Sequence, residues 1–528
     1  MKMSATAKRR IFPIGVQNFE KMRKQDNVYV DKTALIYQMA NTNNSYFLSR
    51  PRRFGKSLLV STLQAYFEGK KELFEGLAME KLETTWTSYP VLLMSFALRR
   101  YNELRDLHWL FDQQLREWEG IYACHTSLKE EDYGGRFLQV IQRAYEQTGK
   151  PVVVLIDEYD SPLLDASAKP ELQTKLRDLM RGFFSPLKDC GKYLRFLFLT
   201  GITKFSQLSI FSELNNLQNI SMLNTYGSLC GITEKEMLSQ LQPDIRALAE
   251  ANGETYEEAC KHLKRKYDGY HFAPLSEDVY NPFSLINVLS SYQYENYWYS
   301  TGTPTFLVEL LREQKFDLKE LEGTLAKAGD FDRATDAIDD AIPVLYQGGY
   351  LTIKGYNKQM DVYTLGYPNE EVRMGFMESL LPSYMSRPMR EGNSFIFFFI
   401  KALQAGDMEE CLLRMQAFFA AIPNDLSNKT ERDYQTIFYL LCRLMGVYVE
   451  TEVKSAIGRA DLVMKTEAAI YVFEFKLDGT PEEALAQIDS KQYAIPYQSD
   501  GRPVVKIGAC FSSATRTLGK WKVEKTGR

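Results

Sequence analysis

The sequence predicts an α/β protein of several domains, and three patterns along the chain support this prediction. In the first block, strand-like runs such as PVVVLIDEY and LRFLFLTG alternate with amphipathic helical stretches, which is typical of a sheet whose two faces are both covered. A mostly helical, aromatic-rich block follows. The last block returns to helical periodicity and changes near Val447 to short strands, giving the order helix, strand, strand, strand, helix, strand.

Chain length sets the expected number of domains. A chain of 528 residues exceeds the size at which one hydrophobic core keeps growing, so about two to four domains are expected. From the changes of pattern we predict a first domain at 10–233, a mostly helical middle region at 234–389 and a last domain at 390–528. No internal repeat or low-complexity linker marks these boundaries.

The composition is that of an ordinary folded protein, with 45% hydrophobic and 25% charged residues. The longest purely apolar run, Phe395 to Ile400, is far shorter than the roughly 20 residues that cross a bilayer. The basic N-terminus is followed by Pro13 and Gly15 instead of the apolar segment of a signal peptide. We therefore expect a cytoplasmic protein with no membrane partner.

Cysteines, histidines and net charge limit the chemistry that can be expected. The seven cysteines are scattered singly and there are four histidines, which argues against zinc knuckles and histidine-built metal sites. A net charge of −4 gives no general attraction to a phosphate backbone, so contacts with nucleic acid must come from local patches. Residues 502–528 carry seven basic side chains against Glu524 alone, and a solvated basic end is the simplest interpretation of them.

A candidate phosphate-binding loop lies in the segment SYFLSRPRRFGKSLLVSTLQAYF, where a strand, a loop and an amphipathic helix meet at Gly55, Lys56 and Ser57. In such a loop, backbone N–H groups and the helix N-terminus hold phosphate oxygens, the lysine reaches the β and γ phosphates, and the serine hydroxyl binds Mg²⁺. The usual spacing would place another glycine at position 50, where this chain has Arg50. An ordinary loop is the alternative, because Gly-Lys-Ser alone is common by chance.

Two later strand ends strengthen the prediction of an ATP site with Mg²⁺. An apolar run leads directly into Asp157 and Glu158, so that Asp157 can support the Mg²⁺ shell while Glu158 polarises the attacking water. The strand LRFLFLTG ends at Thr200, shortly before Lys204, and this polar tip either senses the γ-phosphate or forms a turn. The three elements occur in the order that nucleotide binding requires.

Six segments carry a family resemblance: VYVDKT, FLSRPRRFGKSLL, VVVLIDEYDSPL, FLTGITKFS, YDGYHF and VYNPFSLIN. Together they resemble the bacterial AAA-ATPase-like family, whose members commonly carry a C-terminal PD-(D/E)XK nuclease-like domain. The resemblance implies a P-loop NTPase domain with nucleotide-site roles for Gly55, Lys56, Ser57, Asp157 and Glu158. We add the flanking Arg53, Phe54 and Leu58 to the predicted nucleotide-binding residues. A homo-oligomer is compatible with this class, since a neighbouring copy can supply an arginine to the γ-phosphate.

Two apolar segments near the C-terminus, ADLVMKT and IYVFEFKL, are predicted to form a β-hairpin. Because side chains alternate across a strand, Glu474 and Lys476 share a face with Ile470, while the phenylalanines point to the other face. If Asp461 projects to that face, Asp461 and Glu474 can hold Mg²⁺ or Mn²⁺, and Lys476 can orient the attacking water. An edge strand with one wet face is the alternative.

The interval between Asp461 and the Glu-x-Lys at Glu474 resembles the core of the PD-(D/E)XK nucleases, which implies a restriction-endonuclease-like α/β domain. By this resemblance, Glu431 in the preceding helix supplies a further acid, Arg459 belongs to a Gly-Arg-x-Asp pattern, and Gln487 in the following helix lines the site. Each of these three residues is ordinary when taken alone.

These patterns predict a protein in which ATP binding or hydrolysis controls a metal-dependent nuclease, with DNA favoured over RNA as the nucleic-acid partner. One alternative is a nucleotide-dependent switch and another is a remodeller of protein substrates. In both alternatives the nuclease-like domain binds nucleic acid or protein without cutting. The intact Asp461, Glu474 and Lys476 argue against these alternatives without excluding them.

Overall fold

The computed structural model of the chain divides into two compact units. The first contains Met1–Thr301 and Glu322–Val372, and the second contains Gly302–Leu321 and Arg373–Arg528. The residues described are 10–124, 128–167, 169–203, 217–299, 307–308, 310–311, 314, 316, 318, 321–332, 341–385, 389–421, 436–437, 439–441, 444, 450–452, 461–466, 468–515 and 517–525. The bounds of the three domains placed from the sequence stay predictions.

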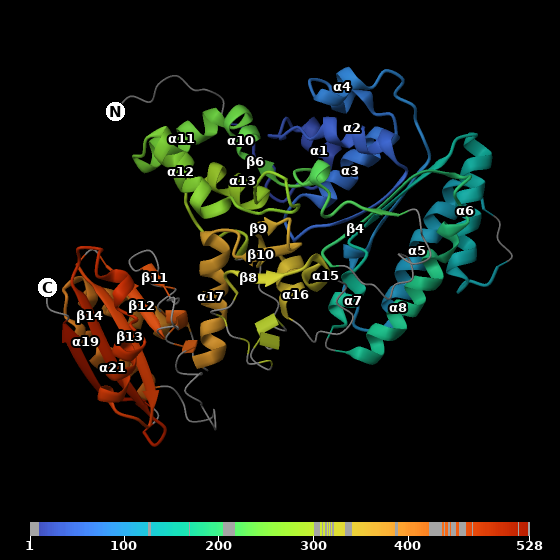
Figure 1. The fold of residues 1–528 in the computed structure, drawn as a ribbon. Coiled ribbons are helices and arrows are strands. Elements are labelled where there is room, and N and C mark those ends of the chain that lie inside the picture. Colours follow the sequence, from blue (N-terminus) through green and yellow to red (C-terminus); the bar gives the residue numbers. More distant parts are fainter. Residues whose placement is uncertain are drawn as a thin grey trace. The chain divides into compact units, whose positions relative to one another are not determined.

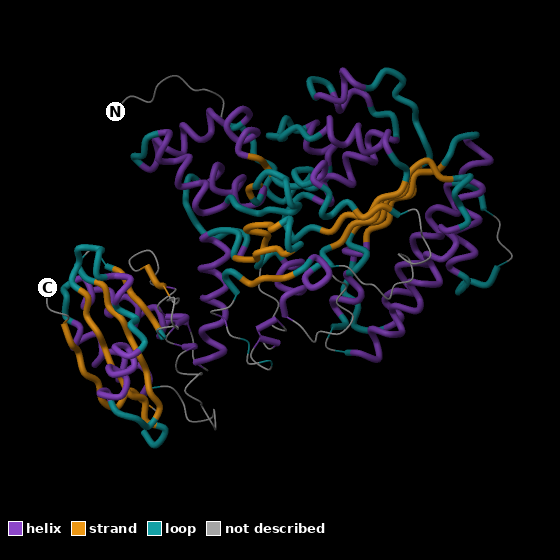
Figure 2. Tube along the Cα trace, viewed as in Figure 1, coloured by secondary structure: helices purple, strands orange, loops and turns teal. Residues whose placement is uncertain are grey.

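A five-stranded parallel sheet forms the centre of the first unit, with strand order β2-β3-β4-β1-β5 (Figures 1 and 2). The strands are β1 (Ser45–Ser49), β2 (Val91–Ser95), β3 (Val152–Asp157), β4 (Leu194–Gly201) and β5 (Gln218–Asn219). Every residue of β3 is buried, as its unbroken apolar run predicted. The carboxyl ends of β1, β3 and β4 meet at one edge of the sheet, which places the loops that follow them together.

Helices cover both faces of this sheet. Its first face is covered by α5 (Leu104–Ile121), α6 (Tyr133–Thr148) and α8 (Pro170–Phe184), visible together in Figure 1. Their contact includes the stacked rings of Phe111 and Phe183, whose centroids are 4.1 Å apart. The other side carries α1 (Phe19–Lys24), α2 (Thr33–Thr42), α3 (Lys56–Phe67) and α4 (Ala78–Leu82), with α3 packed against β3. The short α7 (Ser161–Asp165) follows β3.

A helical part follows the parallel sheet within the first unit. It contains α10 (Glu234–Gln240), α11 (Gln242–Asn252), α12 (Tyr256–Tyr267) and α13 (Pro282–Ser291), joined by the small antiparallel pair β6 (Ile232–Thr233) and β7 (Val279–Tyr280). Its core also takes in Val28 from the N-terminal segment. The predicted helical middle region is therefore confirmed, and a segment from the start of the chain packs into it.

A three-stranded antiparallel sheet within the middle region was not predicted. It has the order β8-β10-β9, with β8 (Thr324–Ala326), β9 (Thr352–Asn357) and β10 (Val362–Gly366), beside α15 (Ala328–Phe331) and α16 (Ala341–Gly348). These strands are short, and the half-exposed end of β9 gives no continuous apolar pattern. The helix α17 (Glu370–Met385) starts in the first unit and continues along the chain into the second.

The second unit contains α18 (Met389–Gln404), α19 (Met408–Ala420) and a five-stranded mixed sheet of order β11-β12-β13-β14-β15. The strands are β11 (Glu450–Glu452), β12 (Leu462–Lys465), β13 (Ile470–Leu477), β14 (Val504–Ser512) and β15 (Thr517–Lys525), with α21 (Pro481–Ser490) between β13 and β14. The predicted hairpin is confirmed as β12 and β13, with Leu462 opposite Phe473. Part of the basic end forms β15, which pairs with β14, and its Lys520, Lys522 and Lys525 are exposed, as expected for a solvated basic end. Across the described part of the chain, no helix is long and apolar enough to span a membrane.

Candidate nucleotide and metal sites

The loop between β1 and α3 has the features of a phosphate-binding loop. Gly55 precedes the first residue of α3 in the left-handed conformation, with φ of 87°, which a residue with a side chain adopts only under strain. No side chain caps this helix start. The first N–H groups of α3 therefore point from the helix N-terminus without a capping acceptor, and such a terminus attracts anions.

Lys56, the first residue of α3, is buried beneath the loop. Its ammonium donates hydrogen bonds to the carbonyl oxygens of Arg50 (2.9 Å) and Pro51 (3.0 Å). Burial lowers the pKa of this amine, and the negative charges of Glu158 and Asp157 oppose that effect. An amine that is bonded only to loop carbonyls, in a pocket of carboxylates, can transfer its hydrogen bonds to a phosphate.

Arg50 stands where the usual motif has glycine, and the structure gives a reason for it. Its buried guanidinium donates to the carbonyl oxygens of Ser49 and Ser221 and to that of Tyr226. It also lies 4.2 Å from the ring centroid of Phe272. Arg50 therefore fastens the segment after β5 to the loop, a structural role that glycine cannot fill.

Ser57 and Asp157 are brought together at the end of β3, as predicted for a Mg²⁺ site. Asp157 is 6% exposed, and burial raises its pKa to about 6, while a hydrogen bond with the Ser57 hydroxyl lowers it. Within the described residues, its Oδ1 atom is buried without a hydrogen-bond partner. Hard oxygen ligands with an unsatisfied buried oxygen fit a divalent cation. Glu158, next in the chain, has a positive φ of 51° and lines the cavity described below.

The polar end of β4 joins two strands of the sheet. The buried Thr200 hydroxyl donates to the carbonyl oxygen of Leu48 at 2.9 Å, so it ties β4 to β1, and its role in sensing the γ-phosphate stays a prediction. Lys204 lies outside the described residues. Sequence reasoning passed over Asp160, a buried carboxylate that accepts from the N–H and the hydroxyl of Thr203. Its signal was its place directly after the Asp157-Glu158 pair.

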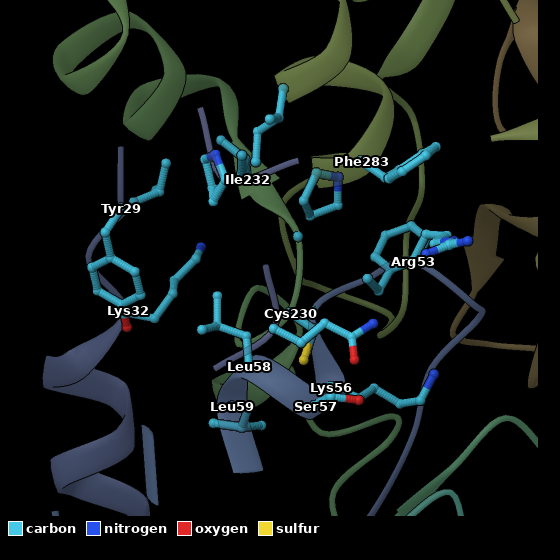
Figure 3. Close-up of a pocket in the computed structure, with 18 of the residues that line it drawn as sticks. Tyr29, Lys32, Arg53, Lys56, Ser57, Leu58, Leu59, Cys230, Ile232 and Phe283 are labelled. Carbon is cyan, nitrogen blue, oxygen red and sulfur yellow. The ribbon is translucent and has the colours of Figure 1, made fainter. Parts of the chain in front are cut away.

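A cavity of about 420 Å³ opens beside the loop (Figure 3). Its floor includes Gly55, Lys56 and Ser57, and Figure 3 shows Tyr29, Ile232 and Phe283 around it. The wall is largely apolar and consists of Val28, Tyr29, Ile36, Ile232, Leu241, Phe283 and Ile286. A pocket of this size, with a polar floor and an apolar wall, matches the division of a nucleotide into phosphates and base. No sequence pattern predicted a role for these wall residues.

The three flanking residues predicted to bind nucleotide have distinct surroundings. Arg53 is exposed, and its guanidinium lies 4.8 Å from the ring centroid of Phe283. Phe54 is 1% exposed and packs edge-on against Tyr270 at 4.7 Å, so it anchors the loop in the helical part. Leu58 lines the cavity. Lys32, also in the wall, pairs with Glu236 at 2.5 Å.

The second unit gathers three of its predicted site residues around Lys476. The ammonium of Lys476 lies 3.3 Å from Oε1 of Glu474 and donates to Oε1 of Gln487 at 2.6 Å. Asp461 precedes β12, and its carboxylate accepts a hydrogen bond from the N–H of Phe475 at 2.8 Å. The predicted face is correct, because the cluster that holds Ile470 also contains residues of α21, the helix that carries Gln487.

The pKa of Glu474 depends on its burial and on both of its charged neighbours at this site. Glu474 is 2% exposed, and burial and the charge of Asp461 raise its pKa to about 7, while Lys476 acts in the opposite direction. In the described part of the chain its Oε2 atom has no hydrogen-bond partner. Two adjacent carboxylates with an unsatisfied buried oxygen fit a divalent cation, which would offset both the burial and the mutual repulsion.

The remaining predicted residues of this site cannot be placed. Glu431 and Arg459 lie outside the described residues. Among those that are described, no group of three or more His, Cys, Asp or Glu side chains is arranged to hold a metal ion. The described ligands of the candidate metal site are therefore the two carboxylates of Asp461 and Glu474.

Comparisons with known proteins match a family model to each of the two regions that carry the candidate sites. Residues 13–211 match the family described as predicted AAA-ATPase, and residues 429–521 match the PD-(D/E)XK nuclease superfamily. An uncharacterized protein in the vnfD 5′ region of Azotobacter chroococcum mcd 1 is 35% identical over 540 residues, which cover 98% of this chain and 100% of that relative. The chain belongs to the bacterial AAA-ATPase-like family with a C-terminal PD-(D/E)XK nuclease-like domain.

No solved structure matches this AAA-ATPase-like protein. The first matched region contains the loop with Lys56 and the strand end with Asp157, and the second contains Asp461 to Gln487. The predicted α/β fold class, with a parallel sheet, a helical middle and a mixed C-terminal sheet, is confirmed by the structure together with these matches.

Proposed function

We propose that this AAA-ATPase-like protein binds and hydrolyses ATP in the cavity of its first unit, and that its second unit is a metal-dependent nuclease that cuts DNA under control of the nucleotide. The observation that carries the nuclease half is the buried Glu474, with one unpartnered oxygen beside Asp461 and Lys476. A buried carboxylate without its hydrogen bonds is costly, so a purely structural role does not account for it.

The chemistry follows from the residues around Glu474. Asp461 and Glu474 would hold Mg²⁺ or Mn²⁺, which when bound supplies Lewis-acid polarisation of the phosphate and acidifies water. Lys476, fixed by Gln487, orients the attacking water and balances charge on the phosphate oxygens. Attack forms one oxygen–phosphorus bond and breaks one ester bond of the backbone.

The nucleotide half rests on the cavity beside the loop. The N–H groups at the start of α3 and the Lys56 ammonium hold the phosphates, and the apolar wall receives the base. Ser57 and Asp157 would hold Mg²⁺, and Glu158 polarises the water that attacks the γ-phosphate. The exposed Arg52 and Arg53 are available to phosphates or to a neighbouring copy in a homo-oligomer.

The deciding experiment is a cleavage assay with single- and double-stranded DNA and RNA, in Mg²⁺ or Mn²⁺, with and without ATP. We expect the wild type to cut DNA and Glu474→Gln to be inactive. Glu524→Gln, which makes the same change on β15, should retain activity and serves as the matched control. Cleavage that persists in Glu474→Gln would overturn the nuclease site.

The same assay tests the control by ATP and separates the alternatives. Lys56→Ala should weaken nucleotide binding and with it the effect of ATP on cleavage. If Lys56→Ala no longer binds nucleotide and yet cuts as the wild type does, with and without ATP, the coupling is wrong. If the wild type hydrolyses ATP and binds nucleic acid or protein but cuts nothing, the switch or remodeller is the correct function.

A further inference from the structure

Trp298 reaches the phosphate loop from a distant part of the first unit. Its indole N–H donates a hydrogen bond of 3.1 Å to the carbonyl oxygen of Arg52, and its side chain is 6% exposed. Gly349 packs close behind the same loop, because a Cβ atom there would lie 2.6 Å from the Cβ of Pro51. The phosphate loop is therefore in direct contact with the middle region.

Glu371 fixes Trp298 from the first turn of α17. One carboxylate oxygen accepts the backbone N–H of Trp298 at 2.7 Å. The other accepts the hydroxyl of Ser284 at 2.7 Å, and Glu371 itself is 0% exposed. Both carboxylate oxygens of Glu371 therefore accept a hydrogen bond, and each donor belongs to a segment that contacts the phosphate loop.

The hydrogen bond from the Ser284 hydroxyl to Glu371 comes from the start of α13. Asn281 caps this helix by accepting the N–H of Ser284, and the intervening Phe283 lies under the guanidinium of Arg53. Glu371 therefore reaches the loop along two routes, one through Trp298 to Arg52 and the other through Ser284 and Phe283 to Arg53.

Nucleotide binding acts on this loop. Two of the three N–H groups of the Lys56 ammonium bond the carbonyl oxygens of Arg50 and Pro51, so a phosphate that binds the same ammonium acts on the group that holds these two peptide groups. Arg52, whose carbonyl is held by Trp298, is the next residue in the loop. A shift of the peptide groups at Pro51 and Arg52 acts directly on the indole and, through it, on Glu371.

We propose that Trp298 and Glu371 are positioning residues that link the phosphate loop to the first turn of α17, so that nucleotide loading changes this helix. Because α17 continues along the chain from the first unit into the second, it is the element that would carry the state of the ATP site toward the nuclease-like unit. This inference rests on the proposed nucleotide site and specifies how nucleotide binding at that site affects α17.

The test is hydrogen–deuterium exchange of the full chain, with and without a non-hydrolysable ATP analogue and Mg²⁺. In the wild type, the analogue should change exchange in peptides covering residues 370–385 by about twofold or more. Trp298→Phe keeps an aromatic six-membered ring and removes the N–H donor together with the five-membered ring that carries it. Glu371→Gln keeps the shape, and its amide can still accept from Trp298 and donate to Ser284. Both variants should bind the analogue within about threefold of the wild type, since one neutral hydrogen bond or less is lost.

In Trp298→Phe the nucleotide-dependent change in α17 should be reduced by half or more, and likewise in Glu371→Leu, which removes both acceptors. Glu371→Gln, which can keep both hydrogen bonds, and Trp109→Phe, an exposed tryptophan elsewhere in the first unit, should keep the change. Thermal unfolding checks that each variant is folded, and either of the two disrupting variants serves if the other is not. A wild-type-like response of α17 in Trp298→Phe and Glu371→Leu would overturn the link, and so would a wild type that binds the analogue without any change in α17. A wild type that binds no nucleotide overturns the proposed ATP site itself, and the link with it.

Discussion

The ammonium of Lys476 donates a 2.6 Å hydrogen bond to the side-chain oxygen of Gln487, so a residue of α21 sets the position of a residue of β13. The amide is neutral, and it can therefore fix the amine without cancelling its charge. Oε1 of Glu474 lies 3.3 Å from the same ammonium and is its second hydrogen-bond acceptor. The geometry of the candidate nuclease site thus depends on the packing of α21 against the sheet.

Removing this amide should slow cleavage without abolishing it. In Gln487→Ala, Lys476 keeps its charge and its contact with Glu474 but loses the bond that orients it. Hydrogen bonds to charged groups contribute about 1.5–3 kcal/mol, so we expect a loss of about 10- to 100-fold in the cleavage rate. Lys476→Ala should lose more, and Gln498→Ala, an exposed glutamine of the same unit, should lose nothing. Equal rates in Gln487→Ala and the wild type would contradict the positioning role.

Lys56→Ala should weaken ATP binding by about tenfold or more, because a charge-assisted contact with the phosphates is lost. The measurement is titration with a fluorescent ATP analogue in Mg²⁺. The folded state should tolerate the change, since the buried amine is bonded only to two loop carbonyls. Lys71→Ala, an exposed lysine after α3, is the matched control. Unchanged affinity in Lys56→Ala would show that the loop does not hold the phosphates.

Local patterns predicted the parts of both sites that lie within one strand or one loop. Alternation along β13 placed Glu474 and Lys476 on one face, and the apolar run before Asp157 predicted a buried strand ending in carboxylates. The resemblance to a known family placed Gln487 at the site, and the structure adds its bond to Lys476, 11 residues away.

Long-range partners could not be predicted in the same way. The bond from Trp298 to Arg52 joins residues 246 positions apart, and the bond from Glu371 to Trp298 spans 73. No periodicity or spacing relates such residues, because the pairing depends on how separate elements pack. The structural role of Arg50 could not be predicted for the same reason, since its acceptors at Ser221 and Tyr226 come from the segment after β5.

Gly508 sits where the start of α21 comes closest to the sheet. A Cβ atom at this position would lie 2.3 Å from the backbone oxygen of Pro481 and 2.9 Å from the side chain of Leu485. Gly508→Ala should therefore push α21 off β14 and destabilise the second unit by about 1–3 kcal/mol. Gly519→Ala on β15 is the control, since its nearest neighbours are at an ordinary 3.6 Å. Urea unfolding compares the two, and equal stability would mean that α21 can shift at little cost.

Glu371 should make the stability of the first unit depend on pH. Burial raises the pKa of Glu371 to about 7. The hydrogen bonds from the Ser284 hydroxyl and the Trp298 N–H and the positive charge of Lys266 lower this pKa, but burial has the larger effect. Between its ordinary value of 4.5 and about 7, the folded state binds the proton more tightly than the unfolded state, so stability falls as pH rises through this window and is level above it. The full effect is on the order of 3 kcal/mol.

Glu371→Gln removes this titration while keeping the shape of the side chain. The variant should therefore gain stability relative to the wild type as pH rises from about 5 to 8. Urea unfolding across this range measures the difference, which cancels the contribution of all other groups. A constant difference between the two proteins would show that Glu371 does not keep its proton on folding.

Glu474→Gln should separate the structural cost of the candidate metal site from its function. Without metal, the amide removes a buried carboxylate that repels Asp461, so the melting temperature of the variant in EDTA should equal or exceed that of the wild type. With Mn²⁺ at about 100 times its dissociation constant, the wild type should gain about 2.7 kcal/mol, or roughly 5–10 °C. Glu474→Gln should lose that gain and Glu524→Gln should keep it. Because stabilisation by an ion requires a site formed in the folded state, an equal gain in all three proteins would place the ion elsewhere.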